Sequence, residues 1–259
     1  MPELDLYTES RKLYAVHYRA DGGRYLIMLP PLFEELTRTR KLMINQARDL
    51  AEKGVNVVRF DYRGTGLSDG RFNEFNLSEA ALDIEEAVSY CKKAGATDVQ
   101  LLGFRFGGYL AIKYLSEHGD IRKAILWEPI LDLKLYWEEL MRIAIANQLV
   151  TFGAVKQGKE ELLTGLKEAG GILIDGYQIS FQAYRDFVDS GAYPSDRMAP
   201  LKDRISAIFW HNKKTHEQFQ GAGLRSYLAV TDKPSWDNIR HVNYRFPELF
   251  NKTMDEAFL

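Results

Sequence analysis

The chain has 259 residues, a formal net charge of −2, 46% hydrophobic residues and 27% charged residues. This balance argues against disorder, and the near-neutral charge excludes the basic field that nucleic-acid binding needs. A single cysteine, Cys91, excludes an intrachain disulfide framework and a cysteine-based zinc cluster. No signal peptide is visible, and no apolar run approaches the ~18 residues that would span a bilayer. The sequence therefore predicts a soluble, cytoplasmic globular protein without a membrane span.

Short β-branched runs alternate with longer amphipathic segments along most of the chain. Alternating apolar residues predict strands, and apolar residues three or four positions apart predict helices. The predicted strands cover residues 13–18, 25–29, 55–60, 99–102, 123–127, 205–210 and 225–230. The predicted helices cover residues 40–53, 77–94, 108–118 and 247–259. This order predicts an α/β protein with a mostly parallel central sheet and helices on both faces.

The alternation stops after Pro129, and residues 130–193 follow a helical, amphipathic pattern. An insertion between two sheet strands is a common way of placing a helical cap over the carboxyl edge of an α/β sheet. We therefore expect residues 1–129 and 200–259 to form an α/β core and residues 130–199 to form a helical cap, within a single domain overall.

A glycine-framed turn joins a predicted strand to a predicted helix, and residues 103–108 there have the sequence Gly-Phe-Arg-Phe-Gly-Gly. This pattern is typical of the nucleophile elbow of the α/β-hydrolase fold, whose middle residue is a serine. Here the middle residue is Arg105, whose guanidinium stays protonated and has no lone pair with which to attack. An arginine at a helix N-terminus favours binding of a carboxylate or phosphate. The alternative is that a protein carboxylate neutralises Arg105, which then binds nothing.

The other two members of a serine-histidine-acid triad are also absent from their usual places. The strand expected after the cap is followed by no carboxylate until Glu217, so the candidate acids are Glu128 and Asp132, one strand earlier. The loop after the last strand, residues 231–237, has no histidine, and His241 is the only late candidate. The sequence thus predicts that serine-hydrolase chemistry is lost or altered.

Six segments carry a more specific pattern: residues 30–40, 61–70, 103–108, 126–130, 175–180 and 234–236. Together they resemble the exosortase A system-associated hydrolases, particularly the type 2 members. The most specific part is Pro-Pro-Leu-Phe-Glu-Glu at residues 30–35 combined with arginine at the elbow. The resemblance implies the α/β-hydrolase fold, an elbow arginine that is a family trait, and an association with bacterial exopolysaccharide or protein-sorting systems.

The segment at residues 30–40 occupies the position of the oxyanion-hole loop, so the topology brings it against the elbow. We predict that Arg105 contacts a carboxylate from Glu34, Glu35 or Glu128. Aromatic residues around the expected cleft suit an acyl chain or a ring, although core packing is the alternative for most of them. The candidate aromatic ligand contacts are Phe33, Phe104, Phe106, Trp127, Trp210 and Trp236.

These features favour a pseudoenzyme or non-serine hydrolase that binds a small molecule with an anionic or acyl group. One alternative is an active esterase in which Glu34, Glu35 or Glu128 activates water as a general base. The other is a structural or partner-binding protein whose cleft is filled by its own side chains. No dinucleotide fingerprint, Walker lysine or histidine pair at ligand spacing occurs, so no cofactor and no metal is expected. The sequence leaves open whether two copies of the chain form a homodimer.

Overall fold

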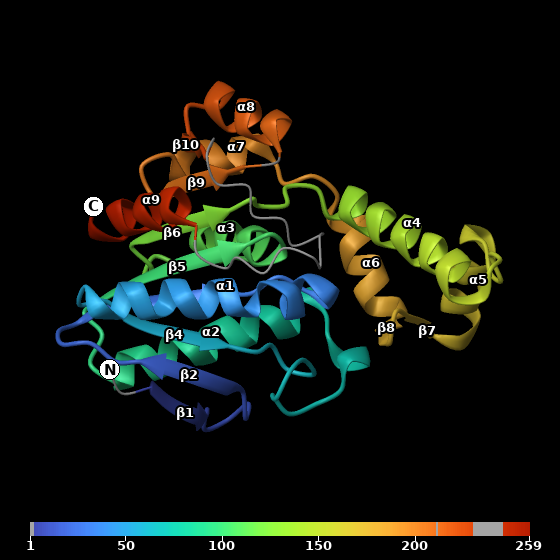
Figure 1. Ribbon diagram of the computed structural model, residues 1–259, viewed down its shortest axis with the longest axis horizontal. Helices are drawn as coiled ribbons and strands as arrows, with labels where there is room; N and C mark the ends of the chain where they lie inside the picture. The colour runs from blue at the N-terminus through green and yellow to red at the C-terminus, as the bar shows by residue number, and fades with distance from the viewer. Residues whose placement is uncertain (1–2, 211, 230–245) are drawn as a thin grey trace.

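The computed structural model describes residues 3–210, 212–229 and 246–259, whose main body is an eight-stranded sheet with helices on both faces (Figure 1). The strands, in spatial order, are β1 (Glu3–Tyr7), β2 (Tyr14–Tyr18), β4 (Asn56–Phe60), β3 (Arg24–Leu29), β5 (Asp98–Phe104), β6 (Lys123–Trp127), β9 (Ile205–Phe209) and β10 (Arg225–Leu228). β2 is antiparallel to β1 and β4, and all other neighbouring strands are parallel. The predicted mostly parallel sheet is confirmed.

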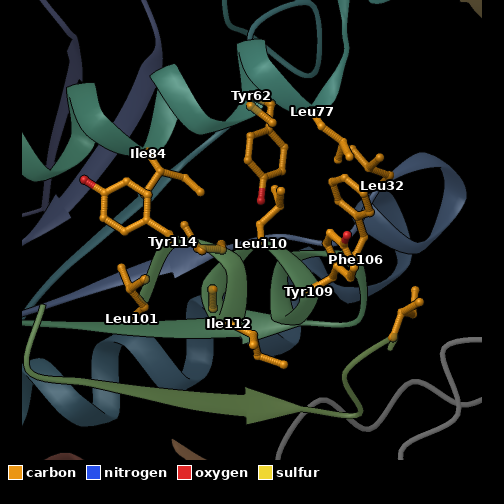
Figure 2. Close-up of a cluster of buried hydrophobic side chains, with 14 of the residues drawn as sticks. Leu32, Tyr62, Leu77, Ile84, Leu101, Phe106, Tyr109, Leu110, Ile112 and Tyr114 are labelled. Carbon is orange, nitrogen blue, oxygen red and sulfur yellow. The ribbon is translucent and has the colours of Figure 1, made fainter. Parts of the chain in front are cut away.

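The helices pack on the sheet through their apolar stripes, as expected for an α/β protein. One face is covered by α1 (Phe33–Glu52) and α9 (Pro247–Phe258), and the other by α2 (Leu77–Lys93), α3 (Phe106–Glu117) and α8 (Lys213–Gly221). In Figure 2, Phe106, Leu110 and Tyr114 of α3 lie in a buried cluster that also contains Ile84 of α2 and Leu101 of β5. Burying each large apolar side chain contributes roughly 1.5–3 kcal/mol, so α3, which carries the turn at its N-terminus, is held firmly.

Most of the segment between β6 and β9 projects beyond one end of the sheet (Figure 1), and its last helix returns to pack on α3. Its elements are α4 (Leu133–Phe152), α5 (Lys159–Ala169), β7 (Gly171–Ile174), β8 (Tyr177–Ser180), α6 (Phe181–Ser190), α7 (Ser195–Met198) and the 3-10 turn η2 (Ala199–Leu201). Two backbone hydrogen bonds tie its ends together, from Leu133 N to Gly191 O and from Tyr193 N to Leu131 O. The boundaries 130–199 for a separate cap stay a prediction.

The prediction that residues 130–193 are helical throughout is wrong at the β7–β8 hairpin. Asp175 and Gly176 form its turn, and both have positive φ values, 48° and 87°. An Asp-Gly pair between apolar runs is a strong hairpin pattern, because it suits the tight turn that joins two antiparallel strands. The helical periodicity of the neighbouring segments obscured it.

Four further elements differ from the sequence prediction. α1 begins at Phe33 rather than near residue 40, since Glu34 and Glu35 in its first turn complement the helix dipole. β1 was not predicted, because it is an exposed edge strand of alternating charged and apolar residues. The short α8, capped by the Asn212 side chain, and the 3-10 turn η1 (Phe72–Glu74) were also missed.

Candidate functional site

Arg105 lies at the turn between β5 and α3, at the carboxyl edge of the sheet. Its backbone has φ 53° and ψ −112°, a conformation that costs a non-glycine residue about 1–3 kcal/mol. Two backbone hydrogen bonds hold it there: Arg105 N donates to Trp127 O at 2.9 Å, and Ile130 N donates to Arg105 O at 3.1 Å. The turn therefore aims the Arg105 side chain in a direction fixed by β5, β6 and the chain that follows β6.

The glycines around Arg105 are required by close packing. A Cβ atom on Gly107 would collide with the backbone oxygen of Leu29, at the end of β3. A Cβ atom on Gly103 would collide with the backbone of Gly107. Because these obstacles are backbone atoms, side-chain rearrangement cannot relieve them. The turn thus has the tight strand-to-helix geometry that the Gly-x-x-x-Gly pattern predicts.

The Arg105 side chain is paired with Glu35 of α1. Arg105 Nε donates to Glu35 Oε1 at 3.0 Å, and both side chains are mostly buried. The hydroxyl of Tyr136, on α4, donates to Glu35 Oε2 at 3.2 Å. The Arg105 guanidinium also lies 6.0 Å from the centroid of the Tyr136 ring. The predicted contact between Arg105 and one of three carboxylates is confirmed, and the partner is Glu35.

Burial and charge oppose each other within this pair. Desolvation raises the pKa of Glu35, and this effect outweighs the charge of Arg105 and the hydrogen bonds from Arg105 and Tyr136. Desolvation acts to lower the pKa of Arg105, but the Glu35 charge outweighs it and the pKa is raised. Arg105 therefore stays charged, while Glu35 takes up a proton more readily than an exposed carboxylate does.

Glu128 binds backbone N–H groups, whereas Glu35 pairs with the Arg105 side chain. It follows β6 with φ 43°, and its buried carboxylate accepts hydrogen bonds from the backbone N–H groups of Trp210 and Asn212. Trp210 directly follows β9 and Asn212 directly precedes α8, so Glu128 links the carboxyl ends of two neighbouring strands. Asp132, the other candidate acid, caps α4 by accepting from Leu135 N at 3.0 Å.

A cavity of about 750 Å³ opens above this group of side chains. Arg105, Glu35, Glu128 and Asn212 line its floor at the sheet edge; we call these four residues the floor. The other lining residues come from α1, α4 and the β7–β8 hairpin: Phe33, Glu34, Arg38, Tyr136, Glu139, Leu140, Ile143, Asn147, Ile174, Asp175, Tyr177 and Ile179. The volume lies within the range of roughly 300–1,000 Å³ typical of small-molecule sites.

A second cavity, of about 850 Å³, lies between α4 and α8. It shares four lining residues with the first cavity: Arg105, Tyr136, Glu139 and Asn212. Tyr136 is one of the aromatic residues expected around the cleft, whereas Glu139 had no assigned role in the sequence prediction. The pattern that could have found Glu139 is its position on the helical face that also carries Leu140 and Ile143.

The predicted aromatic contacts separate into two groups. Phe33 lines the 750 Å³ cavity, where its ring lies 5.3 Å from that of Tyr177. Four others are core residues: Phe104, Phe106, Trp127 and Trp210. Trp127, for example, is fully buried, and its Nε1 donates to Thr253 Oγ1 at 2.9 Å. Trp236 and His241 lie outside the described residues.

Other chemistry-bearing residues have structural surroundings. His17 is buried, with one ring nitrogen 3.0 Å from Tyr90 OH and the other 3.1 Å from Asn56 Oδ1. Burial raises the pKa of the Cys91 thiol. In the described part of the chain, no group of three or more histidine, cysteine, aspartate or glutamate side chains is placed to hold a metal ion. Across the same residues, no helix is both long enough and apolar enough to cross a membrane.

The sheet, the flanking helices and the glycine-framed turn define an α/β hydrolase. The model of one family, described as serine aminopeptidase, S33, matches residues 36–165, and the chain belongs to that family. A related sequence is the AB hydrolase superfamily protein YisY of Bacillus subtilis, 30% identical over 88 residues, or 33% of this chain and 32% of YisY. Another is the uncharacterized protein RP471 of Rickettsia prowazekii, 26% identical over 106 residues, or 40% of this chain and 44% of RP471. The matched segments thus span less than half of either relative.

Solved structures resemble nearly the whole chain. The alpha/beta hydrolase GrgF from Penicillium sp. sh18 is 18% identical, with a TM-score of 0.66 over 99% of this chain and 98% of that one. Est1E from Butyrivibrio proteoclasticus, solved with ferulic acid bound, is 16% identical, with a TM-score of 0.58 over 97% of this chain and 96% of that one. At these identities the similarity establishes the fold.

Proposed function

We propose that this α/β-hydrolase-fold protein binds a small molecule in the 750 Å³ cavity and performs no serine-hydrolase chemistry. The observation that carries the proposal is Arg105 at the turn, in a strained conformation, paired with Glu35 on the cavity floor. We take Arg105 to stand where active relatives have the serine nucleophile. A guanidinium cannot form an acyl intermediate, so the site keeps a binding cavity without a nucleophile at its centre.

The ligand classes considered are acyl-bearing and anionic small molecules. The Arg105 charge is already balanced by Glu35, so an anion would have to displace a buried carboxylate. The apolar side chains of Leu140, Ile143 and Ile174 offer an acyl chain a surface without that cost. The pairing therefore favours an acyl-bearing ligand. The resemblance to exosortase A system-associated proteins supports an accessory role beside a bacterial exopolysaccharide or protein-sorting system.

Hydrolysis of p-nitrophenyl esters of several chain lengths tests this proposal. We expect the wild-type protein and its Arg105→Ala variant to show no turnover above that of buffer. In a parallel thermal-shift measurement, acyl-bearing compounds should raise the melting temperature of the wild type, because they bind the folded state only. Wild-type turnover that disappears in Arg105→Ala would make the arginine catalytic and overturn the proposal.

A second candidate function is ester hydrolysis by water that Glu35 activates. The observation in its favour is the raised pKa of the buried Glu35 carboxylate, which lines the cavity. This candidate predicts wild-type turnover that is lost in Glu35→Gln and kept in Glu34→Gln, its exposed neighbour on α1. Equal loss in both variants, or no wild-type turnover, would exclude it.

A further inference from the structure

Helix α4 presents a single row of side chains to the 750 Å³ cavity. These are Tyr136, Glu139, Leu140, Ile143 and Asn147. Residues three or four positions apart share one face of a helix, so the row follows the helix axis. From Tyr136 to Asn147 the row extends about 16 Å, at 1.5 Å per residue. The cavity is therefore elongated along α4.

The two ends of this row are fixed by hydrogen bonds to different parts of the molecule. At the near end, the Tyr136 hydroxyl donates to Glu35, beside Arg105. At the far end, Asn147 Nδ2 donates to Asp175 Oδ2 at 2.9 Å, at the turn of the β7–β8 hairpin. A long occupant would thus lie with one end on the floor and the other end at the Asn147–Asp175 contact.

The hairpin supplies an apolar wall opposite α4. Ile174 and Tyr177 are directly paired across the two strands, and Ile179 lies two residues further along β8. Alternation along a strand puts these three side chains on one face, and all three line the cavity. With Leu140 and Ile143 on α4, they form an apolar passage between floor and hairpin. Such a passage fits an aliphatic chain, which needs no hydrogen-bond partners along its length.

The charges around the cavity are unequal. Five carboxylate residues line it against two arginines, Arg38 and Arg105. The five are Glu34, Glu35, Glu128, Glu139 and Asp175. On the floor, the one positive charge is already paired with Glu35, and Glu128 adds a second acceptor. A negatively charged head group would therefore be repelled, whereas a hydroxyl head group could donate to either carboxylate.

We infer that the cavity takes a linear aliphatic chain with an uncharged, hydroxyl-bearing head, which lies on the floor while the tail runs along α4 toward the hairpin. The inference rests on the proposed binding function, takes the aliphatic chain of the ligand as the part that the cavity recognises, and adds the charge of the head and the direction of the chain. It also assigns a specificity-determining residue. Ile143 lies seven residues beyond Tyr136, about 10 Å along α4, so it contacts the tail of a long chain and not a short one.

Isothermal titration calorimetry with 1-decanol, decanoate and 1-hexanol tests the inference. We expect the wild-type protein to bind 1-decanol at least about tenfold more tightly than decanoate, a difference of about 1.4 kcal/mol. Equal or tighter binding of decanoate would overturn the inference while leaving the binding function intact. No binding of any of the three chains would instead contradict the proposed function itself.

Two tryptophan variants of α4 test the direction of the chain. Ile143→Trp fills the passage and should weaken 1-decanol at least about tenfold while changing 1-hexanol by less than about threefold. The matched control is Val150→Trp, on the same helix at a side chain 88% exposed, and it should change neither affinity. If Ile143→Trp weakens both chains equally, or neither, the assigned direction is wrong.

The charge variant Glu139→Gln tests the head-group assignment. Glu139 lines the cavity near Glu35 and Arg105, and its removal lowers the negative charge without filling space. We expect the affinity for decanoate to rise by about threefold to tenfold, and that for 1-decanol to stay within about twofold. An unchanged affinity for decanoate would contradict the role given to charge.

Discussion

Two buried ion pairs lie at opposite edges of the central sheet, and their carboxylates behave in opposite ways. At the carboxyl edge, Glu35 accepts hydrogen bonds from Arg105 and Tyr136. At the amino edge, Glu256 of α9 accepts from Lys123, the first residue of β6. It also accepts from Ser206, Tyr227 and Arg225. The second carboxylate thus has about twice as many donors as the first.

The pKa values follow this difference. Desolvation raises the pKa of Glu35 above its usual value, since two donors do not compensate for burial. Desolvation acts in the same direction on Glu256, but the hydrogen bonds from Lys123, Ser206 and Tyr227 outweigh it and lower the pKa. A carboxylate saturated with protein donors stabilises the fold, whereas one left partly unsatisfied beside a cavity is available to a ligand.

The largest expected effect is at the saturated pair. Lys123→Met removes one partner of a buried pair and leaves the Glu256 charge poorly compensated, which should lower the free energy of unfolding by about 3–5 kcal/mol. Urea denaturation at neutral pH measures it. In the matched control Lys92→Met, the remaining partner Asp120 is exposed to solvent, and the change should stay within about 1 kcal/mol. Equal losses in the two variants would contradict the structural role of Lys123.

A smaller effect is expected at the cavity pair. Arg105→Met removes the Glu35 counter-charge, but Glu35 can respond by taking up a proton because its pKa is already raised. The loss should therefore be about 2–4 kcal/mol at pH 8 and smaller at pH 5, where protonation relieves the buried charge. Urea denaturation at both pH values measures this. A loss that is larger at pH 5 would contradict the comparison.

Asp83 of α2 is a third buried carboxylate whose pKa can be compared with those of Glu35 and Glu256. Burial raises the pKa of Asp83 to about 6, despite hydrogen bonds from Arg63 N and Arg11. In the unfolded chain Asp83 loses its proton near pH 4, so its contribution to stability falls as the pH rises from about 4 to 6. The wild type should lose about 2–3 kcal/mol relative to Asp83→Asn across this interval, as measured by thermal denaturation.

The neighbouring Glu86, one helical turn from Asp83, provides the control. Desolvation acts to raise its pKa, but hydrogen bonds from Ser10 outweigh it and the pKa is lowered. Its stabilising contribution should therefore be present above the unfolded pKa and lost as the pH falls. The stability advantage of the wild type over Glu86→Gln should therefore rise as the pH rises, whereas its advantage over Asp83→Asn should fall. If both stability differences changed with pH in the same direction, the assignment of these pKa shifts to local burial and hydrogen bonds would be contradicted.

The smallest expected effect is that of Tyr136→Phe. The variant removes the hydroxyl that donates to Glu35 and leaves the ring in place, so unfolding should become easier by about 1 kcal/mol. The variant should also raise the pKa of Glu35 further, because this carboxylate loses one of its two hydrogen-bond donors. Denaturant unfolding measures the first, and NMR titration of the Glu35 carboxyl measures the second. A lower pKa would contradict the assignment.

The sequence predicts the central fold well, because its strands have unambiguous patterns. β6 has the predicted bounds, and α2 differs by one residue. The errors occur where the local sequence pattern indicates a different structure from the one that the residues adopt in the fold. The first two turns of α1 were assigned to the loop at the oxyanion-hole position, whereas the helix begins at Phe33, directly after that short Pro-Pro-Leu segment. The β7–β8 hairpin sits within a helical context that conceals its Asp-Gly turn.

The candidate site was predicted only in part. The glycine spacing located Arg105, and chain order placed Glu34, Glu35 and Glu128 near it, but nothing in the sequence distinguishes the three carboxylates. Glu35 meets Arg105 because of its angular position on α1, while the strained turn after β6 directs Glu128 to the backbone at Trp210 and Asn212. Tyr136 comes from a distant helix, so its contact depends on how α4 packs.

The most direct test of the central claim is intact-protein mass spectrometry after incubation with an alkyl fluorophosphonate, which labels activated nucleophilic serines. A site with Arg105 paired to Glu35 has no such nucleophile at the turn. We therefore predict that the wild-type mass stays unchanged under conditions that fully label an active serine esterase run alongside. A single adduct per chain on the wild-type protein would contradict the claim and show that another residue supplies the nucleophile.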